Sequence, residues 1–468
     1  MKTDEVKSTK VNSWVDQVED FSPEKRNQKL SLFQEFSQNA TVHGLRHTSQ
    51  HGLFRRGFWC LAFLGMLSGL LYTVFSQVVV ILEYPTITQQ SMEFTAGLPF
   101  PAVTLCSLNQ FRKSVVGDDP AIRQIQLAMS DLGQMSPAIN WSDPIWNYTM
   151  DQKAVEEMEL YLEYIGHPLV ETLMFCSWDN KIYECKDIFK VQKTDFGMCF
   201  TFNGREQNST PRYSMHAGSK YGLTVVAKIM QHEYILGSDN DVAGLRVLLH
   251  DPEETPLVEG RGFNVAPGKA TKGSLKLKQV NYLPPPYKLP FGMVCRNTSA
   301  PDFQNMLTLY DRYDIMACFS ECRSHYIYKV CGCRAIFDRE RFMTENISWT
   351  CGCPIPCKMN IYNAEVSMGD YPSSALMEQI QAIFNLTITE AEFRSNYLKL
   401  TLAYDEFLIE SINQVPEFDF ESIMSTFGGQ LGIFIGASLL SLLEFIEFGL
   451  EIIFFKVLRI GNKTMPRT

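Results

Sequence analysis

Residues 427–447 decide the fold, and they read Phe-Gly-Gly-Gln-Leu-Gly-Ile-Phe-Ile-Gly-Ala-Ser-Leu-Leu-Ser-Leu-Leu-Glu-Phe-Ile-Glu. The stretch is dense in Leu, Ile and Phe, and it is uncharged from Leu431 to Leu443. A bilayer core needs about 20 such residues as a helix. The pattern predicts a membrane-spanning helix at about 427–455, and its alternative is a buried helix of a soluble domain.

A second apolar block, Gly57–Leu82, lies near the other end of the chain. Its 26 residues carry no charge, so it can cross a bilayer, and it begins too late for a signal peptide. Lys and Arg without acids flank the outer ends of both blocks, which places both termini in the cytoplasm. We therefore expect a multi-pass plasma-membrane protein in contact with lipid. Its predicted parts are a tail at 1–56, a span at 57–83, an extracellular domain at 84–426, a span at 427–455 and a tail at 456–468.

Cysteines and glycosylation motifs support an extracellular middle segment. Twelve of the 13 cysteines lie there, which indicates an oxidising compartment and disulfide bonds. Six Asn-x-Ser/Thr motifs lie there too, and they predict bound glycans. The six asparagines are Asn140, Asn147, Asn208, Asn297, Asn346 and Asn385.

The middle segment alternates strand-like and helix-like stretches, which predicts a disulfide-rich α+β domain. Residues 100–106 and 221–228 are rich in β-branched residues, as strands are, whereas 154–164 and 372–385 have helical spacing. Eight cysteines crowd into 295–357. Their spacing permits a zinc site, but a disulfide ladder fits the compartment better. Cys318 and Cys322 would share a helix face, and Cys351 and Cys353 would share a face of an extended strand.

Composition excludes several classes of function. The 468 residues carry a net charge of −10, which argues against a nucleic-acid binder. The chain has no Gly-rich phosphate loop, no His-Glu-x-x-His and no Gly-x-Ser-x-Gly. We therefore expect no enzyme activity, no cofactor and no metal site.

The second apolar block contains residues suited to ion conduction. Small residues permit close helix approach, and carboxylates at spacings of three and four lie on one helix face at its cytoplasmic end. Copies of this helix around an axis would form rings that attract cations, which requires an oligomer. In the alternative interpretation the carboxylates only mark the interfacial end of the helix. A receptor or adhesion protein with two anchors is a further alternative, but it would not need three glutamates on one face of this helix. The predicted pore carboxylates are Glu444, Glu447 and Glu451.

Over most of residues 40–455 the sequence resembles the degenerin/epithelial sodium channel/acid-sensing ion channel family. The resemblance rests on motifs that occur in the family's order. They are His43-Gly44, Phe100-Pro-Ala-Val-Thr-Leu-Cys-Ser-Leu-Asn109, Phe196-Gly-Met-Cys-Phe-Thr-Phe-Asn203, Gly262-Phe-Asn-Val-Ala-Pro-Gly268, Tyr282–Tyr287, Gly428-Gly-Gln-Leu-Gly432 and Gly436-Ala-Ser438.

The resemblance implies a trimeric, amiloride-sensitive channel that prefers sodium, with two transmembrane helices per subunit. Related subunits can also assemble together, so a heterotrimer is possible. The selectivity filter would be Gly436, Ala437 and Ser438, where the second span is broken. His43 and Gly44 would lie on a re-entrant segment that lines the pore below the filter.

The resemblance also implies gating residues and disulfide pairs. Tyr84 and Tyr287 would couple the extracellular domain to the membrane, and Ser425 lies where bulky residues hold degenerins open. Cys331 and Cys333 are left without an assigned partner: the following loop is shortened, or they form a strained bridge, or they stay free. The implied pairs are Cys106–Cys199, Cys176–Cys185, Cys295–Cys357, Cys318–Cys353 and Cys322–Cys351.

The opening stimulus is predicted by elimination. Acid-sensing members carry Asp-Glu-Tyr where this chain reads His232-Glu233-Tyr234, and Thr401 and Thr426 replace further acids. These differences favour an extracellular ligand over protons. Residues 84–443 hold 41 Asp and Glu against 29 Lys and Arg, which would attract a basic amidated neuropeptide. Proton gating, bile acids and mechanical tethering are the alternatives.

Overall fold

The chain divides into two compact units. One comprises both ends of the chain, up to Glu83 and from Phe418, and the other comprises Tyr84–Glu417. The computed structural model describes residues 32–48, 52–116, 163–204, 210–235, 242–310, 312–331, 351–385 and 387–461.

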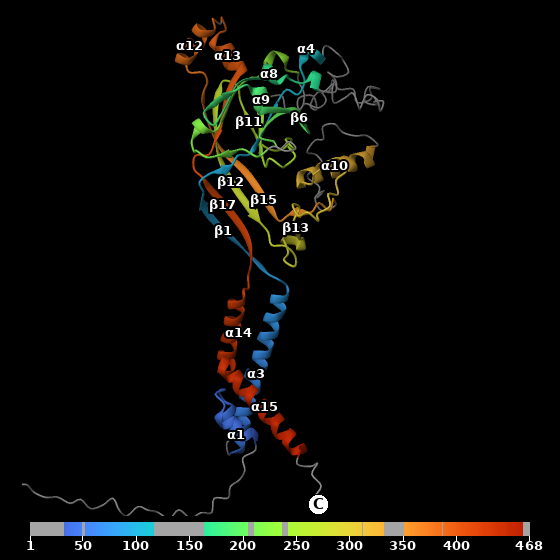
Figure 1. The fold of residues 1–468 in the computed structure, drawn as a ribbon, viewed down its shortest axis with the longest axis vertical. Coiled ribbons are helices and arrows are strands. Elements are labelled where there is room, and N and C mark those ends of the chain that lie inside the picture. Colours follow the sequence, from blue (N-terminus) through green and yellow to red (C-terminus); the bar gives the residue numbers. More distant parts are fainter. Residues whose placement is uncertain are drawn as a thin grey trace, which may run out of the picture. The chain divides into compact units, whose positions relative to one another are not determined.

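The unit formed by the chain ends is helical (Figure 1). α3 and α14 pack along each other, and α2 packs on α3. Stacked aromatic rings join α1 to α15, since the Phe36 and Phe448 centroids lie 4.2 Å apart. The helices are α1 (Leu32–Asn39), α2 (Leu45–Thr48), α3 (Leu53–Leu82), α14 (Phe420–Ile435) and α15 (Leu439–Gly461).

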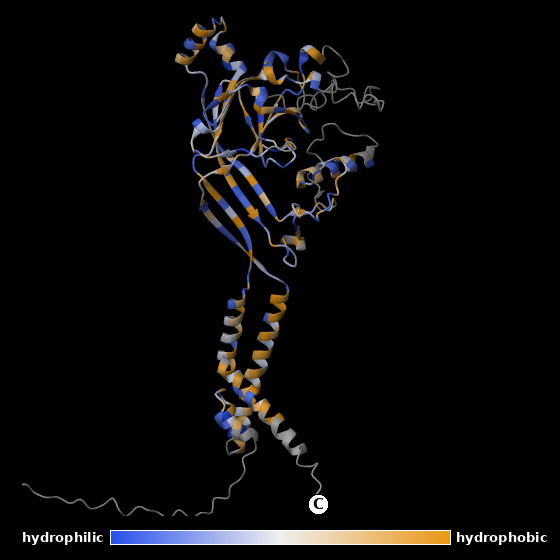
Figure 2. Cartoon of the chain, viewed as in Figure 1, coloured by the Kyte–Doolittle hydropathy of each residue, from blue (hydrophilic) through white to orange (hydrophobic). Residues whose placement is uncertain are grey.

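α3 corresponds to the first predicted span. Within the described residues it is the helix that is long and apolar enough to cross a membrane. Figure 2 shows hydrophobic residues along its length, and large side chains such as Leu61 and Phe75 are more than two-thirds exposed in the single chain. Such a surface requires lipid or another subunit around it.

The second predicted span is divided between α14 and α15. α14 has 16 residues, and at about 1.5 Å per residue it is shorter than the roughly 30 Å of a bilayer core. A single continuous span is therefore not present, and the membrane crossing of this pair stays a prediction. α14 begins at Phe420, before the predicted span, so Phe420–Thr426 of the predicted extracellular segment are helical, and the boundary between that segment and the span stays a prediction. Asp419 explains this start, because it forms a capping box with Ser422.

The second unit contains two larger sheets. An eight-stranded sheet has the order β1-β17-β12-β16-β9-β4-β5, with β15 paired to β12, and a five-stranded sheet has the order β11-β10-β3-β7-β6. Two short pairs, β2 with β8 and β13 with β14, complete it. The strands are β1 (Thr86–Phe94), β2 (Leu98–Pro99), β3 (Ala102–Ser107), β4 (Leu173–Trp178), β5 (Lys181–Tyr183), β6 (Phe189–Thr194), β7 (Gly197–Phe202), β8 (Tyr213–Ser214), β9 (Leu223–Lys228), β10 (Leu245–His250), β11 (Phe263–Val265), β12 (Lys269–Asn281), β13 (Cys295–Arg296), β14 (Ile355–Pro356), β15 (Lys358–Asp370), β16 (Tyr397–Ala403) and β17 (Leu408–Pro416).

The core of this unit lies between the two sheets. β9 and β16 bury every second residue, among them Leu223, Val225, Leu398 and Leu400, as expected for strands with one face on a core. β3 is buried along its whole length, because both of its faces are covered: Val103 and Leu105 lie in the main core, and Cys106 lies in a second buried cluster. The predicted strands at 100–106 and 221–228 are confirmed as β3 and β9. The predicted helix at 372–385 is confirmed as α12 (Ser374–Phe384), capped by Ser373.

Short helices lie around the sheets. α12 and α13 lie at one end of the unit, and α10 stands beside the strands (Figure 1). Of the predicted helix at 154–164, residues 154–162 lie outside the described residues. The remaining helices are α4 (Lys113–Val116), α8 (Leu169–Thr172), α9 (Cys185–Ile188), α10 (Ile315–Cys331) and α13 (Glu390–Asn396), with single 3-10 turns η2 (Ser219–Tyr221), η3 (Gln231–Glu233) and η4 (Pro290–Gly292).

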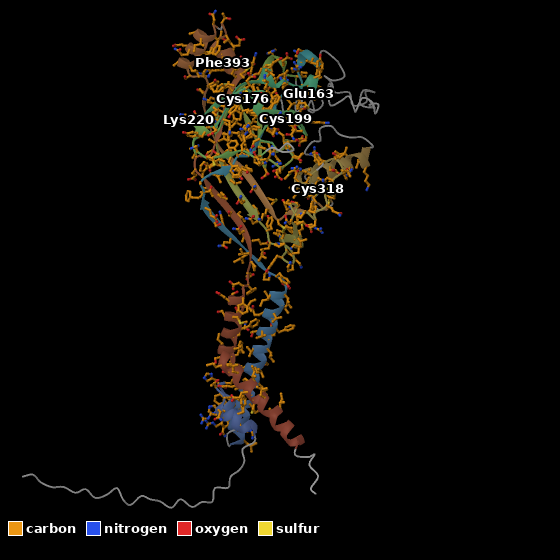
Figure 3. All side chains as sticks on the ribbon, viewed as in Figure 1. Glu163, Cys176, Cys199, Lys220, Cys318 and Phe393 are labelled. Atoms are coloured by element: carbon orange, nitrogen blue, oxygen red, sulfur yellow. A yellow bond between two sulfur atoms is a disulfide. The ribbon has the colours of Figure 1, made fainter. Side chains whose placement is uncertain are left out.

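Five disulfides form among the described cysteines, in the pairs that the family resemblance implies. Figure 3 shows Cys176 and Cys199 among the strands and Cys318 on α10. The expectation that Cys351 and Cys353 share an extended strand is wrong: they flank a turn in which Gly352 has φ +62°. Because of this turn, Cys353 can bond to Cys318 and Cys351 can bond to Cys322, one helical turn further along α10. The pairs are Cys106–Cys199, Cys176–Cys185, Cys295–Cys357, Cys318–Cys353 and Cys322–Cys351.

Candidate functional site

The break between α14 and α15 lies at the predicted filter residues. Gly436 ends α14 in the left-handed conformation, with φ 60° and ψ 24°. Its N–H donates to the Gly432 carbonyl at 3.0 Å, and the Ala437 N–H donates to the Leu431 carbonyl at 3.2 Å. This is a glycine-terminated helix end in which late carbonyls are satisfied by the turn itself. Ala437 is buried, whereas Ser438 is exposed.

The predicted re-entrant segment lies directly against this break. The His43 N–H donates to the Ile435 carbonyl at 3.0 Å. A Cβ atom built on Gly436 would lie 1.5 Å from His43 Nδ1, so only glycine fits here. Gly44 also has a positive φ of 86°, which turns the chain after His43. Gly436 and Gly44 thus allow the backbone of the re-entrant segment to lie close enough to hydrogen-bond to the end of α14.

Apolar contacts hold the same two segments together. Val42, Leu45 and Ala437 form a buried cluster, and Phe36 and Ile435 pack around it. The ring of His47 stacks on Trp59 of α3 at 4.7 Å. The N-terminal segment is therefore a packed part of the helical unit.

A polar contact lies beside this cluster. The Thr41 N–H donates to Glu444 Oε2 at 2.9 Å, and the Thr41 hydroxyl donates to the same oxygen at 3.2 Å. Thr41 Oγ1 also lies 2.6 Å from Ser441 Oγ. The Ser438 N–H donates to Ser441 Oγ at 3.2 Å. Thr41 and Ser441 were not among the predicted site residues.

The three predicted pore carboxylates all lie on α15 but differ in surroundings. Glu444 is half-buried against Thr41, whereas Glu447 is exposed. The side chain of Glu451 lies outside the described residues. Their roles in a pore stay predictions.

α14 and α3 approach closely at one glycine. A Cβ atom on Gly69 would lie 2.8 Å from a ring carbon of Phe434, whereas one on Gly65 would meet nothing within 4 Å. Phe434 precedes Ile435, whose carbonyl binds His43. The packing of α3 therefore bears on the position of the break.

The predicted gating residues lie in both units. Ser425 is an exposed side chain of α14. Tyr84 and Tyr287 contact each other edge to face within the second unit, with ring centroids 5.6 Å apart. Such a contact suits the coupling role that the resemblance implies, and the role stays a prediction.

The segment that contains residues 232–234 binds a buried asparagine through the Glu233 carbonyl and the Ile235 N–H. Asn109 Nδ2 donates to the Phe111 and Glu233 carbonyls and lies 3.0 Å from His167 Nε2. Burial lowers the pKa of His167 to about 4. Burial alone would raise the pKa of Glu233, but a hydrogen bond from the Ser114 backbone and nearby positive charges outweigh it, so this pKa lies below its ordinary value.

Of the six predicted glycan sites, two lie within the described residues. Asn297 and Asn385 are both exposed, as an acceptor must be. Asn140, Asn147, Asn208 and Asn346 lie outside the described residues, as does Cys333 and the side chain of Cys331. Across the described part of the chain, no three His, Cys, Asp or Glu side chains gather as a metal site. Of the cysteines considered for zinc, six are joined in disulfides: Cys295, Cys318, Cys322, Cys351, Cys353 and Cys357.

The pattern that defines a family described as "Amiloride-sensitive sodium channel" matches residues 36–448. The chain belongs to this family. The match covers both the re-entrant segment and the α14–α15 break, which places these features within the part of the chain that the family shares.

Curated relatives of the chain carry the name acid-sensing ion channel. Acid-sensing ion channel 2 of Rattus norvegicus is 29% identical over 94% of this chain and 90% of its own length. Acid-sensing ion channel 1C of Danio rerio is 30% identical over 92% and 85%, and acid-sensing ion channel 1 of Gallus gallus is 28% identical over 92% and 85%. A solved structure, a cryo-EM structure of a proton-activated chloride channel, matches with a TM-score of 0.30 at 8% identity over 84% of this chain and 97% of that chain. That similarity is too low to carry an argument.

Proposed function

We propose that this chain is the pore-forming subunit of a trimeric, amiloride-sensitive cation channel that prefers sodium and conducts at the plasma membrane. The observation that carries the proposal is the Gly436 break with His43 packed against it. A left-handed break in a membrane helix releases backbone carbonyls from the helical ladder, and such carbonyls can replace water around a cation. Gly436, Ala437 and Ser438 would form this filter.

Assembly around an axis follows from the helix count. Two helices per chain cannot surround a pore, so several copies must contribute one helix each. α3 and α14 carry exposed apolar side chains that lipid and neighbouring subunits would cover. The proposed trimer consists of this chain alone or includes related subunits, and both termini face the cytoplasm.

The proposed stimulus is an extracellular ligand, with a basic amidated peptide as the leading class. The excess of 41 acidic over 29 basic residues in 84–443 supports attraction of such a peptide. The environment of Glu233 supports the same proposal. Its hydrogen bond from Ser114 and its lowered pKa keep it ionised at pH 5, so it is poorly suited to sense moderate acid.

Protons are the second candidate stimulus. The curated relatives that cover most of this chain are named acid-sensing ion channels, which favours this alternative. Acid would then have to act through groups other than Glu233.

Recording from cells that express the chain alone tests both candidates. Acid steps to about pH 5 come first, then a panel of amidated peptides, each followed by amiloride. Current with peptide and not with acid is the expected result, whereas a large amiloride-sensitive acid current would refute peptide gating as the main mode. Ser425→Phe serves as the control for pore formation, because a bulky side chain at this exposed site of α14 should hold the channel open. Silence of this variant at the cell surface would contradict a homomeric pore.

A further inference from the structure

Glu444 differs in its contacts from Glu447, the other α15 carboxylate whose side chain the structure describes. Its Oε2 atom accepts hydrogen bonds from both the backbone N–H and the hydroxyl of Thr41, at 2.9 and 3.2 Å. Glu447, three residues further along, is exposed. The two residues have the same chemistry on the same helix, so their difference lies in the segment that packs on Glu444.

The contacts continue from Glu444 to the filter. Thr41 Oγ1 lies 2.6 Å from Ser441 Oγ, which is 1% exposed and accepts the Ser438 N–H at 3.2 Å. A hydroxyl has one hydrogen to donate. If Thr41 donates to the carboxylate, Ser441 donates to Thr41 and is left to accept from Ser438. All four groups are then satisfied in one direction, and the series ends on an acceptor that carries a full charge.

The charge explains why the series has one direction. An ionised carboxylate accepts only, and hydrogen bonds to it are shorter and stronger than those between neutral groups. A carboxylate beside apolar packing is costly unless it is paired in this way. Meanwhile the His43 N–H binds the Ile435 carbonyl, so the segment is held on both sides of the break.

We propose that Glu444 is a positioning residue that clamps the re-entrant segment at Thr41 and, through Ser441, sets the position of Ser438 in the filter. This rests on the proposed channel function and gives Glu444 a role different from that of a carboxylate facing the permeant ion. Ion selection then depends on the hydrogen bonds of Glu444, whereas the exposed Glu447 acts by charge alone.

Permeability ratios of sodium to potassium test the clamp in the Ser425→Phe background, where the stimulus is not needed. Thr41→Val and Glu444→Ala should each lower the ratio severalfold, and the double variant should fall no further than the worse single variant. Thr41→Ser keeps both donors and should retain the parent ratio. Glu447→Ala makes the same truncation at an exposed residue of the same helix, and its loss of ratio should be smaller than that of Glu444→Ala.

Two outcomes would overturn the clamp. One is a Thr41→Val channel with the parent ratio. The other is a double variant whose loss equals the product of the two single losses, as expected for independent groups. Absence of amiloride-sensitive current from the Ser425→Phe parent at the cell surface would instead contradict the proposed homomeric pore.

A covalent measurement tests the clamp without any current. Cysteines introduced by Thr41→Cys and Ser441→Cys, with Cys60→Ser, should form a disulfide in oxidised membranes of the full chain, detected by mass spectrometry. Adding Glu444→Ala should slow its formation severalfold, and adding Glu447→Ala should not. Failure of the disulfide to form, or equal rates in both variants, would overturn the clamp whether or not the protein conducts.

Discussion

Gly436 shows how much one residue can decide. It must adopt φ 60°, which costs an ordinary residue roughly 1–2 kcal/mol, and it must also leave room for the His43 ring. A residue with a Cβ meets the first demand only at that cost, and it cannot meet the second. Gly352 has a similar role, because its positive φ forms the turn between Cys351 and Cys353.

Gly436→Ala should abolish sodium-selective current or surface expression in the Ser425→Phe background. Gly432→Ala is the control, because a Cβ at Gly432 meets nothing within 4 Å. Adding His43→Ala to Gly436→Ala removes the clash but not the backbone strain, so recovery should be partial. The measurements are surface biotinylation and sodium-to-potassium permeability. Parent-like current from Gly436→Ala would contradict the described break.

A buried histidine in the second unit gives a prediction for pH. His250 lies between Thr104 and the Asp251 carbonyl, and burial lowers its pKa to about 4. Its unfolded pKa is about 6.5, so the unfolded chain binds the proton first as pH falls. The contribution of neutral His250 to the free energy of unfolding is fully present above pH 6.5. It declines between about pH 6.5 and 4, by about 1.4 kcal/mol per pH unit at most.

The melting temperature of the detergent-solubilised full chain at pH 7 and pH 5 measures this effect. His250→Gln should lose less stability between the two values than the parent does. Burial raises the pKa values of Asp195 and Glu254, which stabilises the fold as pH falls, but both groups are present in parent and variant alike. An equal pH dependence of parent and variant would show that His250 is not the buried neutral group described.

At the scale of elements, packing joins helices that the sequence separates by hundreds of residues. α3 meets α14 at Gly69, where the Phe434 ring takes the place of a side chain. α10 is held to the turn at 351–353 by two disulfides. It is also held at its first turn by Asp314, which caps the Ala317 N–H and accepts the Thr255 hydroxyl at 2.6 Å. A small number of contacts with distant segments thus fixes the positions of α14 and α10.

Gly69→Val should reduce amiloride-sensitive current in the Ser425→Phe background, since the added methyl groups displace Phe434 and the neighbouring Ile435 carbonyl. Gly65→Val lies one turn away on α3, where a Cβ meets nothing within 4 Å, and should retain current. Both changes replace glycine by valine in the same helix, so the difference in helix propensity between the two residues is the same in both variants. Whole-cell current normalised to surface protein is the measurement. Equal loss in both variants would argue against the described α3–α14 contact.

At the scale of the whole molecule, the single chain leaves an apolar helical surface uncovered. α3 exposes side chains such as Leu71 and Phe75 along a length that spans a bilayer. The second unit has its own core between two sheets and needs no such cover. The second unit thus has a core of its own, whereas the helical unit needs lipid or further subunits to cover its apolar surface.

Cross-linking of intact cells should stop at three copies of the chain. The physical reason is that the proposed pore needs one α14–α15 pair from each of several subunits. Mild denaturation before cross-linking is the control, and it should leave single chains. A final product of two or four copies would contradict the proposed trimer.

The sequence by itself determined the features that depend on local pattern. Length and lack of charge identify α3, alternating residues identify β3 and β9, and the family motifs imply the disulfide pairs. The helix α14 begins before the apolar stretch, because the Asp419 capping box extends it into polar residues. Only the tertiary structure decided that His43 lies on Gly436 and that Thr41 binds Glu444. Those partners lie about 400 residues apart, and contacts between distant segments depend on packing, which no local pattern in either segment contains.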